Sequence, residues 1–176
     1  MGEVSPLPAS ATGHITFGTL TRSVRINHRV IRVWSEILKQ VPGAKLTLDS
    51  GSFRNESTQT PLIEQFAVHG IERERLHFGA HSPPWDVLRA MDIGLDCFPH
   101  NSGTTLLETL YLGVPYVTLL GRPSVGRLGS AFLEGAGHPE WIARTEEDYI
   151  TKAIALASDL PALSKIRSQL REEMKA

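Results

Sequence analysis

The sequence predicts an α/β domain built on a Rossmann-like parallel sheet with helices on both faces. Strand-like and helix-like segments alternate along residues 14–176, which is the pattern of βαβ units. Residues 115–120 form an apolar run that indicates a strand buried on both faces. A chain of 176 residues with 41% hydrophobic residues is long enough to bury one core. A ligand is expected beyond the carboxyl ends of the strands, where the strand order reverses.

The predicted strands are short, rich in β-branched, apolar or aromatic residues, and bounded by turn residues. In chain order they are residues 14–19, 45–48, 75–78, 92–96, 115–120 and 141–143. Residues 1–13, rich in Pro, Ser, Ala and Gly, are expected to form a linker, and residues 51–60 a polar loop. The domain is therefore expected to span residues 14–176.

The predicted helices carry apolar residues on one face and begin or end at glycine or proline. In the first of them Val30, Trp34 and Ile37 share a face, and Pro42 with Gly43 ends the pattern. Later helices are closed by glycine or opened by proline in the first turn. In chain order the predicted helices are residues 27–40, 61–69, 82–91, 104–112, 124–134, 146–158 and 161–174.

Composition excludes several classes of function. A formal net charge of -1, from 18 basic and 19 acidic residues, gives no field that favours nucleic acid. The single cysteine, Cys97, excludes an internal disulfide, and the 7 histidines lack metal-ligand spacing, so no metal is expected. No apolar run reaches the ~18 residues of a membrane span. The acidic, proline-punctuated start is unlike a signal peptide, so we expect no membrane contact and a cytoplasmic location.

The segment Asn101–Glu108 is the strongest candidate for a ligand site. It follows the predicted strand 92–96 and runs into a helix whose first N–H groups carry partial positive charge. Asn101 and the small residue Gly103 let an anion approach the backbone, and the next two residues, Thr104 and Thr105, add hydroxyl donors. This arrangement is typical of a diphosphate site.

Glu108 lies one turn further along the same helix face, four residues after Thr104 and three after Thr105. A carboxylate there can accept both hydroxyls of a ribose. The alternative is that Thr104 only caps the helix and Glu108 is solvated. The chain has neither a Walker A motif nor a Gly-x-Gly-x-x-Gly fingerprint, so ordinary NTPases and dinucleotide-binding proteins are unlikely matches.

Three stretches resemble the family of O-linked N-acetylglucosamine transferases and SPINDLY-like enzymes. They are Asp92–Pro99, Gly103–Leu110 and Leu112–Leu119, in the order and spacing of that family. The segments around Ile15–Gly18, Arg25–Asn27 and Trp34–Leu38 are similar to the start of the family's C-terminal lobe. The resemblance covers about residues 14–170 and implies one lobe of a two-lobed GT-B glycosyltransferase.

The resemblance also implies a function. The family transfers N-acetylglucosamine from UDP-GlcNAc to protein serine or threonine with inversion and without a metal or other cofactor. Its acceptor proteins bind through N-terminal regions, often tetratricopeptide repeats, that precede this lobe. UDP-sugar and a protein acceptor are therefore the expected partners. A non-catalytic binding module of the same fold, or a transferase that uses UDP-glucose or another sugar, is the alternative.

The family pattern assigns roles to individual residues. Thr104 and Thr105 match diphosphate-binding hydroxyls, and Glu108 matches an acidic ribose-binding position. Arg25 matches a catalytic lysine on the diphosphate, and Arg22 a polar position that faces the phosphates. Arg25 departs from the family because a planar guanidinium replaces a compact ammonium.

The uracil side of the expected site departs from the family as well. Pro84 stands where many relatives have a histidine, so His81 or Trp85 is expected to cover a face of the base instead, and the backbone of Ala80–Ser82 to contact the uracil edge. Arg127, in the loop after strand 115–120, is expected at the same edge of the sheet, although a surface ion pair fits it equally well. His100 is as consistent with solvent exposure as with ligand contact, and Asp49 fits a turn better than the site.

Overall fold

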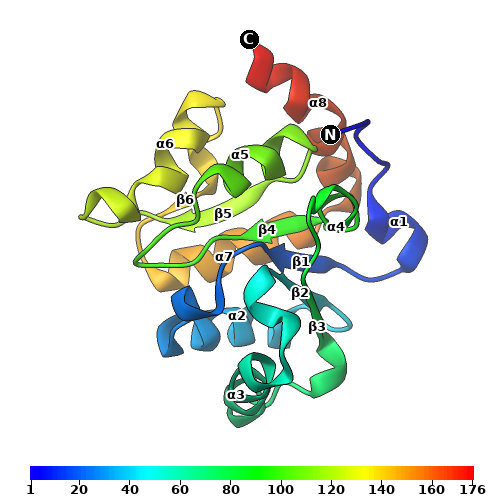
Figure 1. Cartoon of the computed structure of the whole chain (residues 1–176). Coiled ribbons are helices and arrows are strands. Elements are labelled where there is room, and N and C mark those ends of the chain that lie inside the picture. The colour runs from blue at the N-terminus through cyan, green and yellow to red at the C-terminus, as the bar shows by residue number, and fades with distance from the viewer.

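An all-parallel sheet forms the centre of the protein in the computed structural model, which describes residues 1–176 (Figure 1). The order of its six strands reverses between β1 and β4, which is the order of a Rossmann sheet. All six predicted strands are present, so the predicted fold class is confirmed. In spatial order the strands are β3 (Leu76–Gly79), β2 (Lys45–Asp49), β1 (Thr16–Thr19), β4 (Ile93–Leu95), β5 (Tyr116–Leu119) and β6 (Ile142–Ala143).

Seven helices follow the strands as predicted, α1 is an additional short helix, and two of the predicted helices start more than three residues away from the expected position. The helices are α1 (Pro8–Thr12), α2 (His28–Gln40), α3 (Glu56–Val68), α4 (Trp85–Arg89), α5 (Thr104–Tyr111), α6 (Leu128–Gly135), α7 (Glu146–Ala157) and α8 (Leu160–Lys175). Short 3₁₀ turns are η1 (Ser23–Arg25), η2 (Gly51–Arg54), η3 (Arg73–Arg75), η4 (Ser124–Gly126) and η5 (Pro139–Trp141). None of these helices has the length and apolar character required to cross a membrane.

The two differences have local causes. Helix α3 begins within the predicted loop 51–60 and contains Pro61, which is tolerated because the carbonyl that loses its donor belongs to the exposed Ser57. The predicted helix 124–134 is divided, because the N–H of Arg127 bonds to the carbonyl of Ser124 in a 3₁₀ turn and α6 begins only afterwards.

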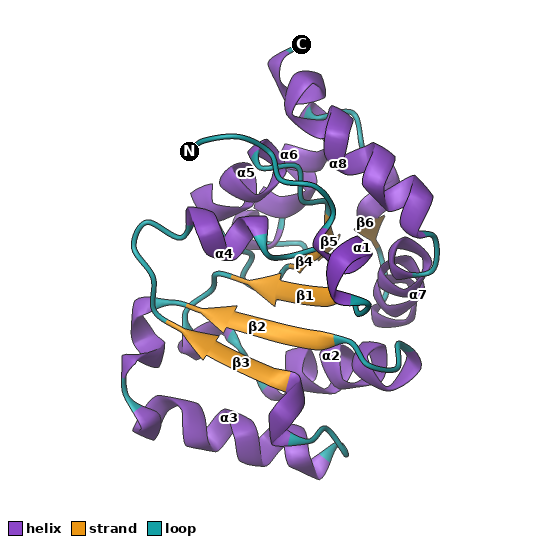
Figure 2. Cartoon of the chain, turned by 90° about the vertical axis from the view of Figure 1, so that its right-hand side faces the viewer, coloured by secondary structure: helices purple, strands orange, loops and turns teal.

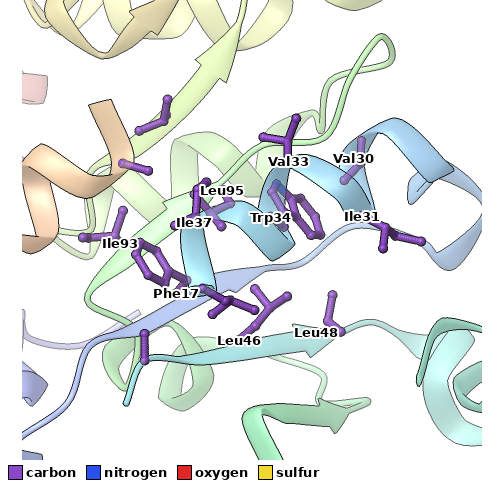
Figure 3. Packing of buried hydrophobic residues seen from close by; sticks show 14 of the residues in the cluster. Phe17, Val30, Ile31, Val33, Trp34, Ile37, Leu46, Leu48, Ile93 and Leu95 are labelled. Atoms are coloured by element: carbon purple, nitrogen blue, oxygen red, sulfur yellow. The ribbon is translucent and has the colours of Figure 1, made fainter. Parts of the chain in front are cut away.

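Neighbouring residues of β5 point to opposite faces and so identify the two helical layers. Val117 joins the large core in which α2 and α7 pack on β1, β2 and β4, while Tyr116 joins a smaller core with α5, α6 and α8. Figure 3 shows the large core, with Trp34 and Ile37 of α2 directed toward Phe17 and the neighbouring strands. Helices on both faces are thus confirmed.

The N-terminal residues lie on the domain, where the sequence predicts a linker. Leu7 and Ala9 are buried, and the N–H of Ala9 donates to Asp92 at 2.8 Å. Arg167 of α8, itself 1% exposed, donates to the carbonyl and hydroxyl oxygens of Ser5 at 2.8 and 2.7 Å. Figure 2 shows this segment running beside α8. Apolar side chains at residues 7 and 9 favour this packing over a solvated linker.

The reversal of strand order brings two loops together. The loop after β1 contains η1 and leads into α2, where Asn27 caps the helix by accepting from the N–H groups of Arg29 and Val30. The same Asn27 side chain donates to the carbonyl of Phe98, in the loop after β4, at 2.7 Å. One side chain therefore fixes both the start of α2 and the position of the second loop.

Candidate functional site

Helix α5 begins with unpaired donors at the point where the strand order reverses. Gly103 precedes the helix, no side chain caps it, and the space where a Cβ of Gly103 would stand is open. The first backbone N–H groups of the helix therefore have no partner within it. Because the positive end of the helix dipole lies here too, the site favours an anion.

Thr104, Thr105 and Glu108 continue this site along one face of α5. Thr104 is exposed at the first helical position, and Thr105 and Glu108 are partly exposed. Burial raises the pKa of Glu108 above its usual range. The helix places the carboxylate one turn from the two hydroxyls. This is the geometry that the sequence predicts for holding a diphosphate and a ribose.

Arg22 and Arg25 lie across the reversal point from α5. With Val24, Asn27, Pro99 and His100 they line an open pocket of ≈ 410 Å³. The guanidinium of Arg25 reaches the carbonyl of Asn101 at 3.4 Å, so it spans from the loop after β1 to the loop after β4. His100 is exposed at the rim of this pocket. The two arginines that the sequence predicts near the phosphates thus line the same pocket.

The prediction that Asn101 contacts the ligand requires a correction. It is 1% exposed, its amide nitrogen donates to the carbonyl of Cys97 at 3.0 Å, and its amide oxygen accepts from the N–H of Gly129 at 3.1 Å. Its backbone N–H donates to the carbonyl of Val125. The side chain holds the loop against α6. Its amide nitrogen and oxygen already bond to buried backbone groups, so it offers no free group to a ligand.

His81 and Arg127 lie at the same edge of the sheet, and each is tied to a neighbour. The ring Nδ1 of His81 lies 2.6 Å from Asp49, and the backbone N–H of His81 donates to the other oxygen of this 2%-exposed carboxylate. Asp49 therefore orients His81 and is more than a turn residue. The Nε of Arg127 donates to the carbonyl of Gly121 at 3.1 Å on an exposed surface.

The sequence analysis missed Asp96, the buried carboxylate that holds the loop before α5. Asp96 is fully buried, accepts from the N–H of Ser102 at 2.9 Å and accepts from the hydroxyl of Thr118 at 2.7 Å. Burial raises the pKa of Asp96 to about 7. The available signal is an aspartate at the end of an apolar strand, since a buried carboxylate must find donors.

Buried hydrogen bonds connect the backbone of Asp96 to α7 and α2, the helical layer on one face of the sheet. The indole N–H of Trp34 donates to the hydroxyl of Tyr149 at 3.1 Å, and that hydroxyl donates to the carbonyl of Asp96 at 2.7 Å. Tyr116 donates its hydroxyl to the carbonyl of Gly129 at 2.6 Å, on the other face. The end of the strand at Asp96 is therefore bonded to α7 on one face of the sheet, and β5 is bonded to α6 on the other.

The chain is similar to glycosyltransferases in both sequence and structure. The model of glycosyl transferase family 41 matches residues 5–176. The chain is 35% identical over 184 residues to the probable UDP-N-acetylglucosamine–peptide N-acetylglucosaminyltransferase SPINDLY of Solanum lycopersicum, covering 98% of this chain and 19% of that protein. A mutant O-GlcNAc transferase of Thermobaculum terrenum superposes with a TM-score of 0.89 at 34% identity, covering 96% of this chain and 34% of that one.

A more distant structure shares the fold alone. The HepE protein of Anabaena, solved in complex with UDP and glucose, has a TM-score of 0.69 at 16% identity, with 98% of this chain and 48% of that one covered. The chain thus spans about a fifth of the SPINDLY relative and a third of the Thermobaculum enzyme chain. With the family model matched from residue 5 to the last residue, this chain belongs to glycosyl transferase family 41, as its resemblance to O-linked N-acetylglucosamine transferases and SPINDLY-like enzymes predicts.

Proposed function

We infer that this chain is the donor-binding lobe of an inverting transferase that moves N-acetylglucosamine from UDP-GlcNAc to protein hydroxyls. The observation that carries this proposal is the uncapped start of α5, with Thr104 and Glu108 on it and Arg25 facing it across the strand reversal. The names of the SPINDLY and Thermobaculum relatives supply the sugar and the peptide acceptor. The UDP in the HepE complex supports the nucleotide.

Each residue has a chemical role in this proposal. The first N–H groups of α5 and the hydroxyls of Thr104 and Thr105 hold the diphosphate, and Glu108 accepts the ribose hydroxyls. Arg22 and Arg25 stabilise the charge that develops on the leaving diphosphate, without a metal. His81 and Arg127 contact the base and the sugar side of the donor.

In this proposal, the acceptor protein binds to parts of the enzyme outside these residues. A GT-B active site is a cleft between two lobes, and the relatives are several times longer than this chain. The other lobe, with tetratricopeptide repeats before it, would bind the acceptor protein and supply the base that takes the hydroxyl proton. Transfer from labelled UDP-GlcNAc by a longer form of the protein would separate a working enzyme from a non-catalytic module.

The direct test is calorimetric titration of the chain with UDP, CDP and ADP, followed by UDP-GlcNAc and UDP-glucose. We expect UDP to bind at micromolar to low millimolar concentration and more tightly than CDP or ADP. Tighter binding of UDP-GlcNAc than of UDP-glucose supports the proposed sugar. No UDP binding at millimolar concentration, or equal binding of all three nucleotides, contradicts the proposal.

Replacing Arg25 with methionine should weaken UDP binding by about 10- to 100-fold, because a charge-assisted hydrogen bond contributes ~1.5–3 kcal/mol. Arg25→Lys should lose less, since it retains the charge. Arg54→Met is the matched control, because Arg54 is exposed at the end of η2 after the neighbouring strand β2. Equal losses for the Arg25 and Arg54 variants would mean that only net charge matters.

A further inference from the structure

The loop that precedes α5 contains a buried carboxylate with no cationic partner. Asp96 directly follows β4, and its two side-chain oxygens accept from the backbone N–H of Ser102 and the hydroxyl of Thr118. Its hydrogen-bond partners are thus neutral, and the nearest thiol, Cys97, is buried beside it. A buried carboxylate satisfied by neutral donors only is held near the balance between its charged and uncharged forms.

This carboxylate and the proposed diphosphate share one loop. Ser102, whose N–H bonds to Asp96, stands two residues before Thr104, so the carboxylate lies within roughly 10 Å of an anion held at the start of α5. Packing leaves Asp96 no room to turn away, because a Cβ on Gly129 of α6 would stand only 2.6 Å from its Oδ2. Two negative charges at this separation oppose each other, and burial of one of them on Asp96 weakens the screening by water.

We propose that Asp96 is a positioning residue that couples the donor site to a proton: binding of the diphosphate is accompanied by net proton uptake, on average a fraction of a proton per site, on the Asp96 carboxyl. This proposal rests on the proposed function. The bond that forms is O–H on Asp96, and the proton comes from the solvent. The uncharged carboxyl keeps both contacts, since one oxygen still accepts from Ser102 and the other donates to the Thr118 hydroxyl.

The surroundings of Asp96 set the pH at which this coupling occurs. Burial raises the pKa of Asp96 to about 7, so both forms are present at neutral pH without a ligand. The titratable groups that face it are Cys97 in the loop after β4, Tyr116 on β5 and Tyr149 on α7, and burial raises the pKa of each further above neutrality. They stay uncharged near pH 7, so Asp96 is the group in this cluster that titrates there.

The sign of the effect follows from the like charges. A bound diphosphate raises the pKa of Asp96, so affinity is highest below pH 7 and falls as the pH rises through the free and bound pKa values. A rise of one pKa unit corresponds to a loss of about tenfold in affinity and to uptake of roughly half a proton midway between the two values.

The test is calorimetric titration with UDP-GlcNAc between pH 6 and 9, in buffers of different ionisation enthalpy that report the protons exchanged. UDP-GlcNAc is the ligand of choice because UDP itself has a terminal phosphate monoester that titrates near pH 6. In UDP-GlcNAc both phosphates are esterified, so the ligand takes up no proton in this range. Asp96→Asn mimics the uncharged carboxyl, so we expect pH-independent affinity above pH 7 and no proton uptake there.

Two further variants complete the test. Asp92→Asn changes another buried carboxylate, which lies just before β4 and accepts from the N–H groups of Ala9 and Thr16 at the opposite edge of the sheet, so its proton uptake should equal the wild type. Thr118→Val removes one donor from Asp96 and should move the uptake maximum to higher pH.

If the wild type binds UDP-GlcNAc without taking up a proton, or if the Asp96→Asn variant takes up as many protons as the wild type, the coupling is overturned and the proposed function stands. If UDP-GlcNAc fails to bind at every pH, the proposed function itself is overturned.

Discussion

The double variant Thr104→Val/Glu108→Ala should bind UDP at least about 100-fold more weakly than the wild type, with little change in melting temperature. The valine keeps the shape of threonine but loses the hydroxyl donor at the exposed start of α5. The alanine removes the carboxylate proposed for the ribose. Each lost hydrogen bond to a charged group costs ~1.5–3 kcal/mol, and both groups are at the surface, so folding is almost unaffected.

Helix α3 offers a matched control for this variant. Thr60 and Glu64 have the same spacing, are both exposed and lie on a helix away from the site. Thr60→Val/Glu64→Ala should therefore leave UDP affinity unchanged, as measured by calorimetry on both proteins. Unchanged affinity in the Thr104/Glu108 variant would show that the nucleotide binds elsewhere.

Arg167→Met should lower the free energy of unfolding by about 3–5 kcal/mol, the usual cost of breaking a buried charged network. In addition to Ser5, the guanidinium donates to the carbonyls of Met91 and Arg89, each at 2.7 Å. Burial lowers the pKa of Arg167 to about 10, so it remains charged at neutral pH. Its loss leaves several buried acceptors unpaired and detaches the N-terminal segment from α8.

Chemical denaturation of the two proteins measures this effect, and thermal unfolding should show a decrease of roughly 10 °C for a chain of this size. Lys165→Met, on the exposed side of the same helix, is the control and should stay within about 0.5 kcal/mol of the wild type. A change equally small for Arg167→Met would mean that the N-terminal segment contributes nothing to stability.

The sequence predicts the strands and the start of α5 well, because both depend on local patterns. Apolar runs identify all six strands, and the hydroxyls after Gly103 identify the start of α5. The boundaries that differ have non-local or weak local signals. Pro61 suggests a helix start but is tolerated inside α3, where the exposed chain leaves the unpaired carbonyl to water.

The partners of polar side chains could not be predicted in the same way. Asn101 is predicted as a ligand contact but binds Cys97 and Gly129, the latter 28 residues away on α6. Asp49 is predicted as a turn residue, yet it holds His81, 32 residues later. These partners depend on which loops meet at the edge of the sheet. A single amino-acid sequence does not show which loops these are.

The hydrogen bonds from Trp34 to Tyr149 and from Tyr149 to Asp96 also have a spectroscopic consequence. The Trp34 indole is fully buried and away from water, so its fluorescence emission should lie at shorter wavelength than that of an exposed indole. The other tryptophans, Trp85 and Trp141, lie in different parts of the fold. The fluorescence of Trp34 can thus be used to follow changes near the loop before α5, because Trp34 is two hydrogen bonds away from the end of the strand that precedes this loop.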